Sequence, residues 1–126
     1  ILYSTVRPNL RPYGLIRNVE ENTVVSTGFI VLRSTIKYIP NEYIFMAITR
    51  PEITEYLHSI AEQAKATYPS IKDEDLMAVN IIVPSEAFFS KGEGQGFVSI
   101  YKHINLINSE NHHLRALQSL LTSKLA

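Results

Sequence analysis

The first third of the chain consists of short apolar stretches separated by turn residues, which is the pattern of β-strands. Residues 1–6 predict a first strand and residues 15–19 a second. β-Branched and aromatic residues dominate 23–33 and predict a longer, buried strand, in which Gly28 indicates a bulge or a close backbone approach. Residues 7–14 contain two prolines and end in glycine, so we expect no regular structure there.

After Pro40 the apolar positions recur with the period of a helix. Asn41 is placed to cap a helix that extends to about Thr49, and Pro51 suits the first turn of a second helix. The expected apolar faces are Tyr43, Ile44, Ala47 and Ile48 on the first helix, and Ile53, Leu57, Ile60 and Ala61 on the second.

The next part of the chain returns to short elements. Residues 63–69 predict a loop, after which Ser70 is placed to cap a helical turn over 71–76. Three consecutive acidic residues in this turn suit the N-terminus of a helix. Residues 78–83 predict a further strand, which Pro84 ends.

No proline or glycine interrupts residues 97–125, so we predict one long helix there. Its heptad a positions are Ile104, Asn111, Gln118 and Leu125, and its d positions are Ile100, Ile107, Leu114 and Leu121. Two a residues are polar, which in coiled coils fixes register or partner number at a cost in stability. Leu117 and Leu120 widen the apolar stripe. We expect the apolar a and d residues to be buried against a partner, namely Ile100, Ile104, Ile107, Leu114 and Leu121.

Together these elements predict an α+β fold: a mixed sheet with short helices, followed by a long C-terminal helix of the coiled-coil type. We expect a globular domain over 1–96, with a hinge at 85–96, and a helical arm over 97–126. The hinge is predicted because Lys91–Gly96 holds three glycines. A phosphate-binding loop is disfavoured there, since no Lys-Ser/Thr follows and Glu93 repels phosphate.

Composition narrows the class of protein. The chain has 126 residues, 45% of them hydrophobic, which is enough for one domain with a core. There is no cysteine for a disulfide or a thiolate site, and the apolar runs are too short to span a bilayer. The absence of a starting Met and of a signal-like segment predicts a soluble, intracellular piece that begins within a fold.

The charge is balanced overall but not along the chain. Twelve basic residues oppose twelve acidic ones, which excludes nucleic-acid binding by bulk charge. Residues 1–50 hold six basic and three acidic residues, and residues 51–126 hold six and nine. The first seventeen positions contain three arginines and no acid, so a local cationic face or an ordinary solvated loop is expected there.

No arrangement of residues argues for catalysis or for a metal. Glu110 and His113 have the helical spacing of a di-metal carboxylate motif, but such a site needs the motif twice and further glutamates. His112 and His113 are adjacent, so on a helix they point about 100° apart. No G-x-S-x-G element orders a serine nucleophile. We therefore expect no enzyme activity, no metal and no cofactor.

Four segments carry a resemblance to a known family. They are Leu2-Tyr-Ser-Thr-Val-Arg-Pro-Asn9; Val24-Val-Ser-Thr-Gly-Phe-Ile-Val-Leu32; Thr67-Tyr-Pro-Ser-Ile71 with Asp75-Leu76 and Asn80-Ile-Ile-Val-Pro84; and Leu114-Arg-Ala-Leu-Gln-Ser-Leu-Leu-Thr-Ser-Lys-Leu125. In this order and spacing they resemble the specificity (S) subunits of type I restriction-modification enzymes. An S subunit has two target recognition domains, each followed by a long helix, and the two helices pair antiparallel as a spacer.

The resemblance implies that residues 1–96 are the C-terminal part of one target recognition domain and that 97–126 are its spacer helix. It implies a cytoplasmic, non-catalytic subunit that binds double-stranded DNA and recruits the modification (methyltransferase) and restriction subunits. The spacer helix would pair with a second one, in cis or in a homodimer. No membrane is involved. The target DNA sequence depends on loop geometry and is not predicted.

Two loops are the candidate DNA contacts that the resemblance and the charges together suggest. On the first, Arg7 and Arg11 face either phosphates or a guanine edge in the major groove. Ser4, Thr5 and Tyr13 add hydrogen bonds there, and Lys65, Thr67 and Tyr68 form the second loop. A plainer role for Tyr68 is a loop anchor packed on the core. The candidate helix interface is Ile100, Ile104, Ile107, Asn111, Leu114 and Leu121.

The alternative function, from a different class, is a helix-mediated interaction module with no direct role on DNA. The heptad pattern of 97–125 and the zero net charge support this alternative. Salt-sensitive affinity for DNA distinguishes the two, because only phosphate contacts release counterions.

Overall fold

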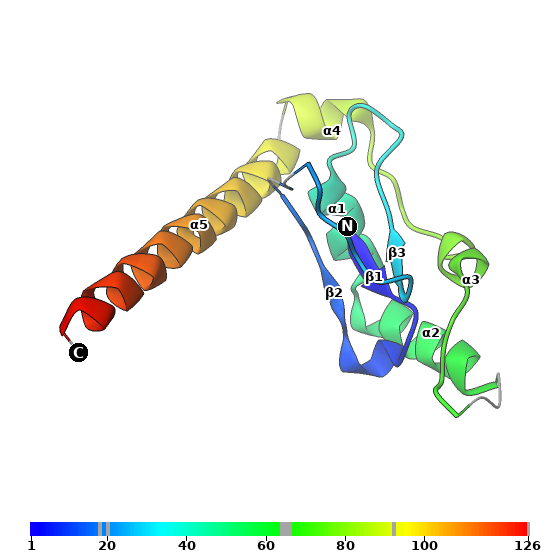
Figure 1. Ribbon diagram of the computed structural model, residues 1–126. Coiled ribbons are helices and arrows are strands. Elements are labelled where there is room, and N and C mark those ends of the chain that lie inside the picture. Colours follow the sequence, from blue (N-terminus) through cyan, green and yellow to red (C-terminus); the bar gives the residue numbers. More distant parts are fainter. Residues whose placement is uncertain (18, 20, 64–66, 92, 126) are drawn as a thin grey trace. The chain divides into compact units, whose positions relative to one another are not determined.

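The computed structural model in Figure 1 describes residues 1–17, 19, 21–63, 67–91 and 93–125. In chain order its elements are β1 (Leu2–Ser4), the 3₁₀-helix η1 (Pro8–Leu10), β2 (Tyr13–Gly14), β3 (Phe29–Val31), α1 (Asn41–Ile48), α2 (Pro51–Gln63), α3 (Asp73–Met77), α4 (Glu86–Lys91) and α5 (Glu93–Leu125). They form two compact units, Ile1–Pro84 and Ser85–Ala126. The predicted α+β class with a long C-terminal helix is confirmed.

The sheet of the first unit has the order β2-β1-β3 and is antiparallel at both pairings, so the predicted mixed sheet is wrong. The second strand lies at Tyr13–Gly14 rather than at 15–19, and its register pairs Tyr13 with Tyr3. The third strand keeps only Phe29–Val31 of the predicted 23–33. It is also an edge strand whose Phe29 and Val31 side chains are exposed, and Val24 before it is 88% exposed. The β-branched and aromatic composition therefore predicts a strand that is longer and more deeply buried than the observed one.

One face of the sheet packs on the helices. Tyr3 is fully buried at the centre, and Tyr13 and Ile30 on the flanking strands pack against the same core. As the helical periodicity predicts, α1 buries Ala47 and Ile48, whereas α2 buries Leu57 and Ala61. The start of α2 at Pro51 is also confirmed. The buried residues of the core are Ile1, Tyr3, Ile48, Leu57, Ala61, Ile71 and Leu76.

Two helix starts differ from the prediction because the residues expected to cap them take other positions. Pro40, not Asn41, is the N-cap of α1, and the Asn41 carboxamide oxygen instead accepts the Ser34 N–H at 2.7 Å. Lys72, not Ser70, precedes α3, where the Asp75 carboxylate accepts the Lys72 backbone N–H at 2.8 Å. Ser70 forms an antiparallel bridge with Val6.

The predicted strand at 78–83 is wrong, although its alternation is real. Val79 and Ile81 pack against the core, whereas Asn80 and Ile82 are exposed. The Ile82 carbonyl accepts the Tyr43 hydroxyl at 2.7 Å. The segment is therefore a stretch without helix or strand that lies against α1 with no ladder partner among the described residues.

In the second unit the segment predicted as a hinge contains helix, since α4 extends to Lys91 and α5 begins at Glu93. Gly92 lies outside the described residues. Gly94 is buried within α5, at a close approach to α4: a Cβ there would lie 2.6 Å from the Phe88 carbonyl oxygen. Gly94 and Gly96 thus do not prevent helix, and Gly94 allows the two helices to pack.

The long helix α5 has 33 residues, which corresponds to about 50 Å. Its seam side chains, which we expect to be buried, are exposed in the single chain. Exposed fractions at the seam range from 44% at Ile104 to 63% at Leu121. The predicted burial therefore requires a second chain or segment.

Tyr3 supplies a stability prediction for the first unit. It is fully buried, and its hydroxyl lies beside the hydroxyl of the buried Thr54. Burial raises the pKa of the Tyr3 phenol above its usual 10.0. Tyr3→Phe should therefore change the free energy of unfolding at pH 7 by no more than about 1 kcal/mol, because it keeps the buried ring and removes only the contact with the Thr54 hydroxyl.

The pH dependence of this variant gives a second measurement. A folded pKa above the unfolded one means that the stabilisation is complete below pH 10 and is lost as the pH rises through the folded pKa. In urea titrations at pH 7 and 10.5, Tyr3→Phe should lose less stability than the parent chain. Tyr56→Phe, on an exposed side chain, is the control. An equal alkaline loss in the parent chain and in Tyr3→Phe would contradict the prediction.

Candidate nucleic-acid interface

The turn after β1 holds two arginines in an unusual backbone conformation. Arg7 (φ 50°, ψ 64°) and Arg11 (φ 54°, ψ 46°) are both left-handed and flank η1. Pro8, the first residue of η1, is fully buried. The expectation of no regular structure over 7–14 is therefore wrong for five residues, the three of η1 and the two of β2. A left-handed non-glycine residue costs about 1–2 kcal/mol, so surrounding contacts must hold each arginine in place.

Backbone hydrogen bonds supply these contacts. The Arg7 carbonyl accepts the Leu10 N–H at 3.0 Å, and the Arg11 carbonyl accepts the Tyr13 N–H at 2.9 Å. The Arg11 N–H in turn donates to the Pro8 carbonyl at 2.9 Å. The turn also packs on α2. It is therefore a fixed support for two exposed basic side chains.

The structure brings the two predicted loops together. The Arg7 N–H donates to the Pro69 carbonyl at 2.9 Å, and the Ile71 N–H donates to the Thr5 carbonyl at 2.9 Å. The Arg7 guanidinium carbon lies 5.3 Å from the centroid of the Tyr68 ring, within the range of a cation–π contact. The Tyr68 side chain is nevertheless 60% exposed. Arg7 and Tyr68 thus form one surface, to which the exposed Thr67 is adjacent in sequence.

The other predicted contact residues take internal positions. Ser4 is buried, and its hydroxyl donates to the Val6 carbonyl and accepts the Val6 N–H. The Thr5 hydroxyl donates to the Gly28 carbonyl at 3.1 Å. These two hydroxyls hold the base of the Arg7 turn in place. Lys65 lies outside the described residues.

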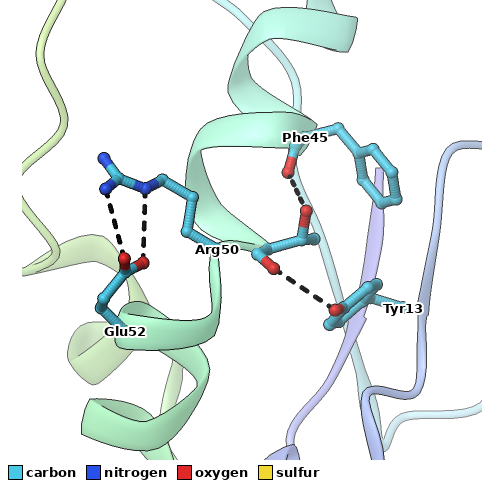
Figure 2. A network of polar contacts seen from close by, with 5 residues as sticks. Tyr13, Phe45, Arg50 and Glu52 are labelled. Atoms are coloured by element: carbon cyan, nitrogen blue, oxygen red, sulfur yellow. Dashed lines mark hydrogen bonds and ion pairs between the residues drawn. The ribbon is translucent and has the colours of Figure 1, made fainter.

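Tyr13 is half-buried and faces α1, as Figure 2 shows. Its ring packs on Tyr3 and Phe45, with centroids 5.4 and 5.8 Å away. Its hydroxyl donates to the Thr49 carbonyl at 3.4 Å. Tyr13 therefore fixes β2 against the end of α1.

The two arginines of the turn differ from Arg17 and Arg50 in their ion pairs. Arg17 pairs with Glu42, and Arg50 pairs with Glu52 at 3.4 Å (Figure 2). Within the described part of the chain, Arg7 and Arg11 form no ion pair and are exposed. They therefore carry uncompensated positive charge on a rigid turn.

Hollows elsewhere in the first unit suit phosphate less well. One of about 560 Å³ lies beside Thr5 but is lined by Asp73 and Glu74 as well as by Lys72. The described residues contain no group of three or more His, Asp or Glu side chains that could hold a metal ion. None of the described helices is both long and apolar enough to cross a membrane.

Sequence reasoning found the two arginines and both loops but missed the left-handed backbone. Each arginine precedes a proline, which normally favours an extended conformation. The repeated Arg-Pro pair was the available signal of an unusual turn. At Arg7 the backbone N–H donates to the distant Pro69 carbonyl, a contact that the local sequence does not contain.

Comparison with known proteins finds a related specificity subunit. Over 86 residues, 68% of its length, the chain is 33% identical to the type I restriction enzyme HindI specificity subunit of Haemophilus influenzae. The chain spans about a fifth of that relative, since the match covers 19% of it. No protein-family model matches the chain, and no solved structure matches it.

The match relates the chain to the type I restriction enzymes. The matched protein is a specificity subunit, which confirms the family resemblance that the four sequence segments indicate.

Proposed function

We propose that this chain is part of a cytoplasmic, non-catalytic DNA-specificity subunit of a type I restriction-modification system. In this proposal residues 1–96 contribute a partial target recognition domain that binds double-stranded DNA. The observation that carries the proposal is the pair of exposed arginines on the strained turn at η1, which have no ion pair with any described residue and of which Arg7 lies over the Tyr68 ring. The related specificity subunit from Haemophilus influenzae supports it.

The proposed DNA surface consists of Arg7, Arg11, Thr67 and Tyr68, with Lys65 in the same loop as the last two. Ser4, Thr5 and Tyr13 have a supporting role, because their side chains bond within the fold. Arginine is suited to phosphate and to guanine edges, since its planar donors bind both in pairs.

The proposed role of α5 is that of a spacer helix. Its exposed apolar seam, Ile100, Ile104, Ile107, Leu114 and Leu121 around Asn111, would pair with a second spacer helix in cis or in a homodimer. The methyltransferase and restriction subunits are the further partners in this proposal.

The second candidate function is a helix-mediated interaction module without a role on DNA. The observation that favours it is the same seam, since large apolar side chains exposed along a single helix indicate a protein partner. The seam alone does not distinguish the two functions, whereas DNA binding does.

The deciding experiment measures DNA binding by the chain assembled with its methyltransferase, using a randomised duplex library. The double variant Arg7→Ala/Arg11→Ala should weaken binding to the enriched sequence at least tenfold. It should also reduce the magnitude of the slope of log K against log salt, by no more than about two. The matched control is Arg33→Ala/Lys37→Ala, which removes the same charge from two exposed residues. No enriched sequence, or equal affinity and salt dependence in both double variants, would refute the DNA role.

A further inference from the structure

We infer that the two turn arginines have different tasks on DNA. In this inference, which rests on the proposed function, Arg7 is held by Tyr68 and binds a backbone phosphate, whereas Arg11 enters a groove and reads a base edge. Phosphate contacts fix the register of a protein on the duplex, and base contacts supply sequence preference.

Arg7 is held at its backbone and at its side chain. Its N–H donates to the Pro69 carbonyl, and the antiparallel bridge between Val6 and Ser70 lies next to it. Its guanidinium lies over the Tyr68 ring, which covers one face and leaves the N–H donors along the edge available. A guanidinium held against the protein surface does not extend deep into a groove. It is suited to bidentate binding of a phosphate at that surface.

Arg11 differs from Arg7 because only its backbone is held in place. It ends η1 with its backbone fixed by the Pro8 carbonyl, but its side chain is exposed and makes no ion pair or stacking contact in the described chain. Leu10 beside it is 65% exposed, so this end of the turn projects from the unit. A fixed backbone with a free side chain allows the guanidinium to reach O6 and N7 of a guanine.

Within the proposed DNA surface Tyr68 is then a positioning residue, which acts on DNA through Arg7. Its ring, not its hydroxyl, makes the cation–π contact with Arg7. Tyr68→Phe should keep the affinity for DNA. Tyr68→Leu should lower it about two- to fivefold for every sequence, the range of an exposed cation–π contact.

The test is selection from a randomised duplex library by the chain with its methyltransferase, together with salt titrations. Arg7→Ala should weaken all sequences by the same factor and lower the salt slope by about one. Arg11→Ala should reduce the preference at a single base pair by about five- to 150-fold and leave the other positions unchanged.

The outcomes separate this inference from the proposed function. If Arg7→Ala relaxes one base pair, or if Arg11→Ala weakens all sequences equally, the division of tasks is wrong while the DNA role stands. A Tyr68→Phe variant that behaves as Tyr68→Leu does would overturn the positioning role. If neither arginine variant changes binding or salt dependence, the proposed DNA function fails together with the inference.

Discussion

Gly94→Ala is expected to detach α4 from the first turns of α5, whereas Gly96→Ala should not. A Cβ at position 94 would lie 2.6 Å from the Phe88 carbonyl oxygen and 2.8 Å from the Phe89 Cα. Both atoms belong to the backbone of α4, so no side-chain rotation relieves the collision. Overpacking of this kind costs about 1–3 kcal/mol, and the better helix propensity of alanine offsets only about 1 kcal/mol of it.

Gly96 is a matched control two residues away in the same helix. A Cβ there would meet no atom within 4 Å, so Gly96→Ala should stabilise α5 by about 1 kcal/mol. Amide hydrogen exchange of residues 86–91 measures the packing of α4 directly. Exchange should accelerate in Gly94→Ala and stay the same or slow in Gly96→Ala. Acceleration in both variants would show that glycine at 94 has no special packing role.

Of these glycines, Gly94 takes part in a packing contact that the sequence alone did not predict. Three glycines in Lys91–Gly96 indicate a hinge when propensity alone is considered, because glycine is a poor helix former. The structure uses Gly94 for a close approach between two helices, which overrides propensity. By contrast, periodicity was sufficient for α2 and α5, whose apolar positions repeat over several turns. Long elements were therefore predictable, and a packing contact between neighbouring helices was not.

The predictions of short strands were wrong for a related reason. The Val24–Leu32 run has the composition of a buried strand, yet only Phe29–Val31 pair with β1. Val79 and Ile81 alternate inward as in a strand, but no described strand lies beside them. Composition reports whether a segment fits a half-buried surface, and it does not report whether a neighbouring strand is available.

The candidate site was predictable in composition but not in geometry. The excess of arginine before position 17 selected Arg7 and Arg11, and both proved exposed and unpaired among the described residues. The polarity of Ser4 gave no reason to exclude it from the candidate DNA contacts. It is buried because β1 lies in the centre of the sheet, which only the folded chain shows. The contact between Arg7 and Tyr68 joins residues 61 positions apart, so only the folded chain reveals it.

The seam of α5 leads to the second large effect. Ile107→Asp should abolish self-association of the chain, whereas Leu106→Asp should not. The two side chains are equally accessible, at 53% and 56%, but only Ile107 lies at a d position of the heptad. A carboxylate buried in a helix interface without a partner costs several kcal/mol, so self-association should weaken at least a hundredfold.

Sedimentation equilibrium over a range of concentrations measures this effect, with the parent chain expected to form a dimer through α5. Asn111→Leu, at a polar a position, should strengthen association and change the number of chains, because a buried polar residue at this position limits both. Equal loss of association in Leu106→Asp and Ile107→Asp would contradict the heptad assignment, as would an Asn111→Leu variant with unchanged affinity and stoichiometry. A parent chain that stays monomeric at every concentration would exclude the homodimer and leave pairing in cis as the form in which the exposed seam is covered.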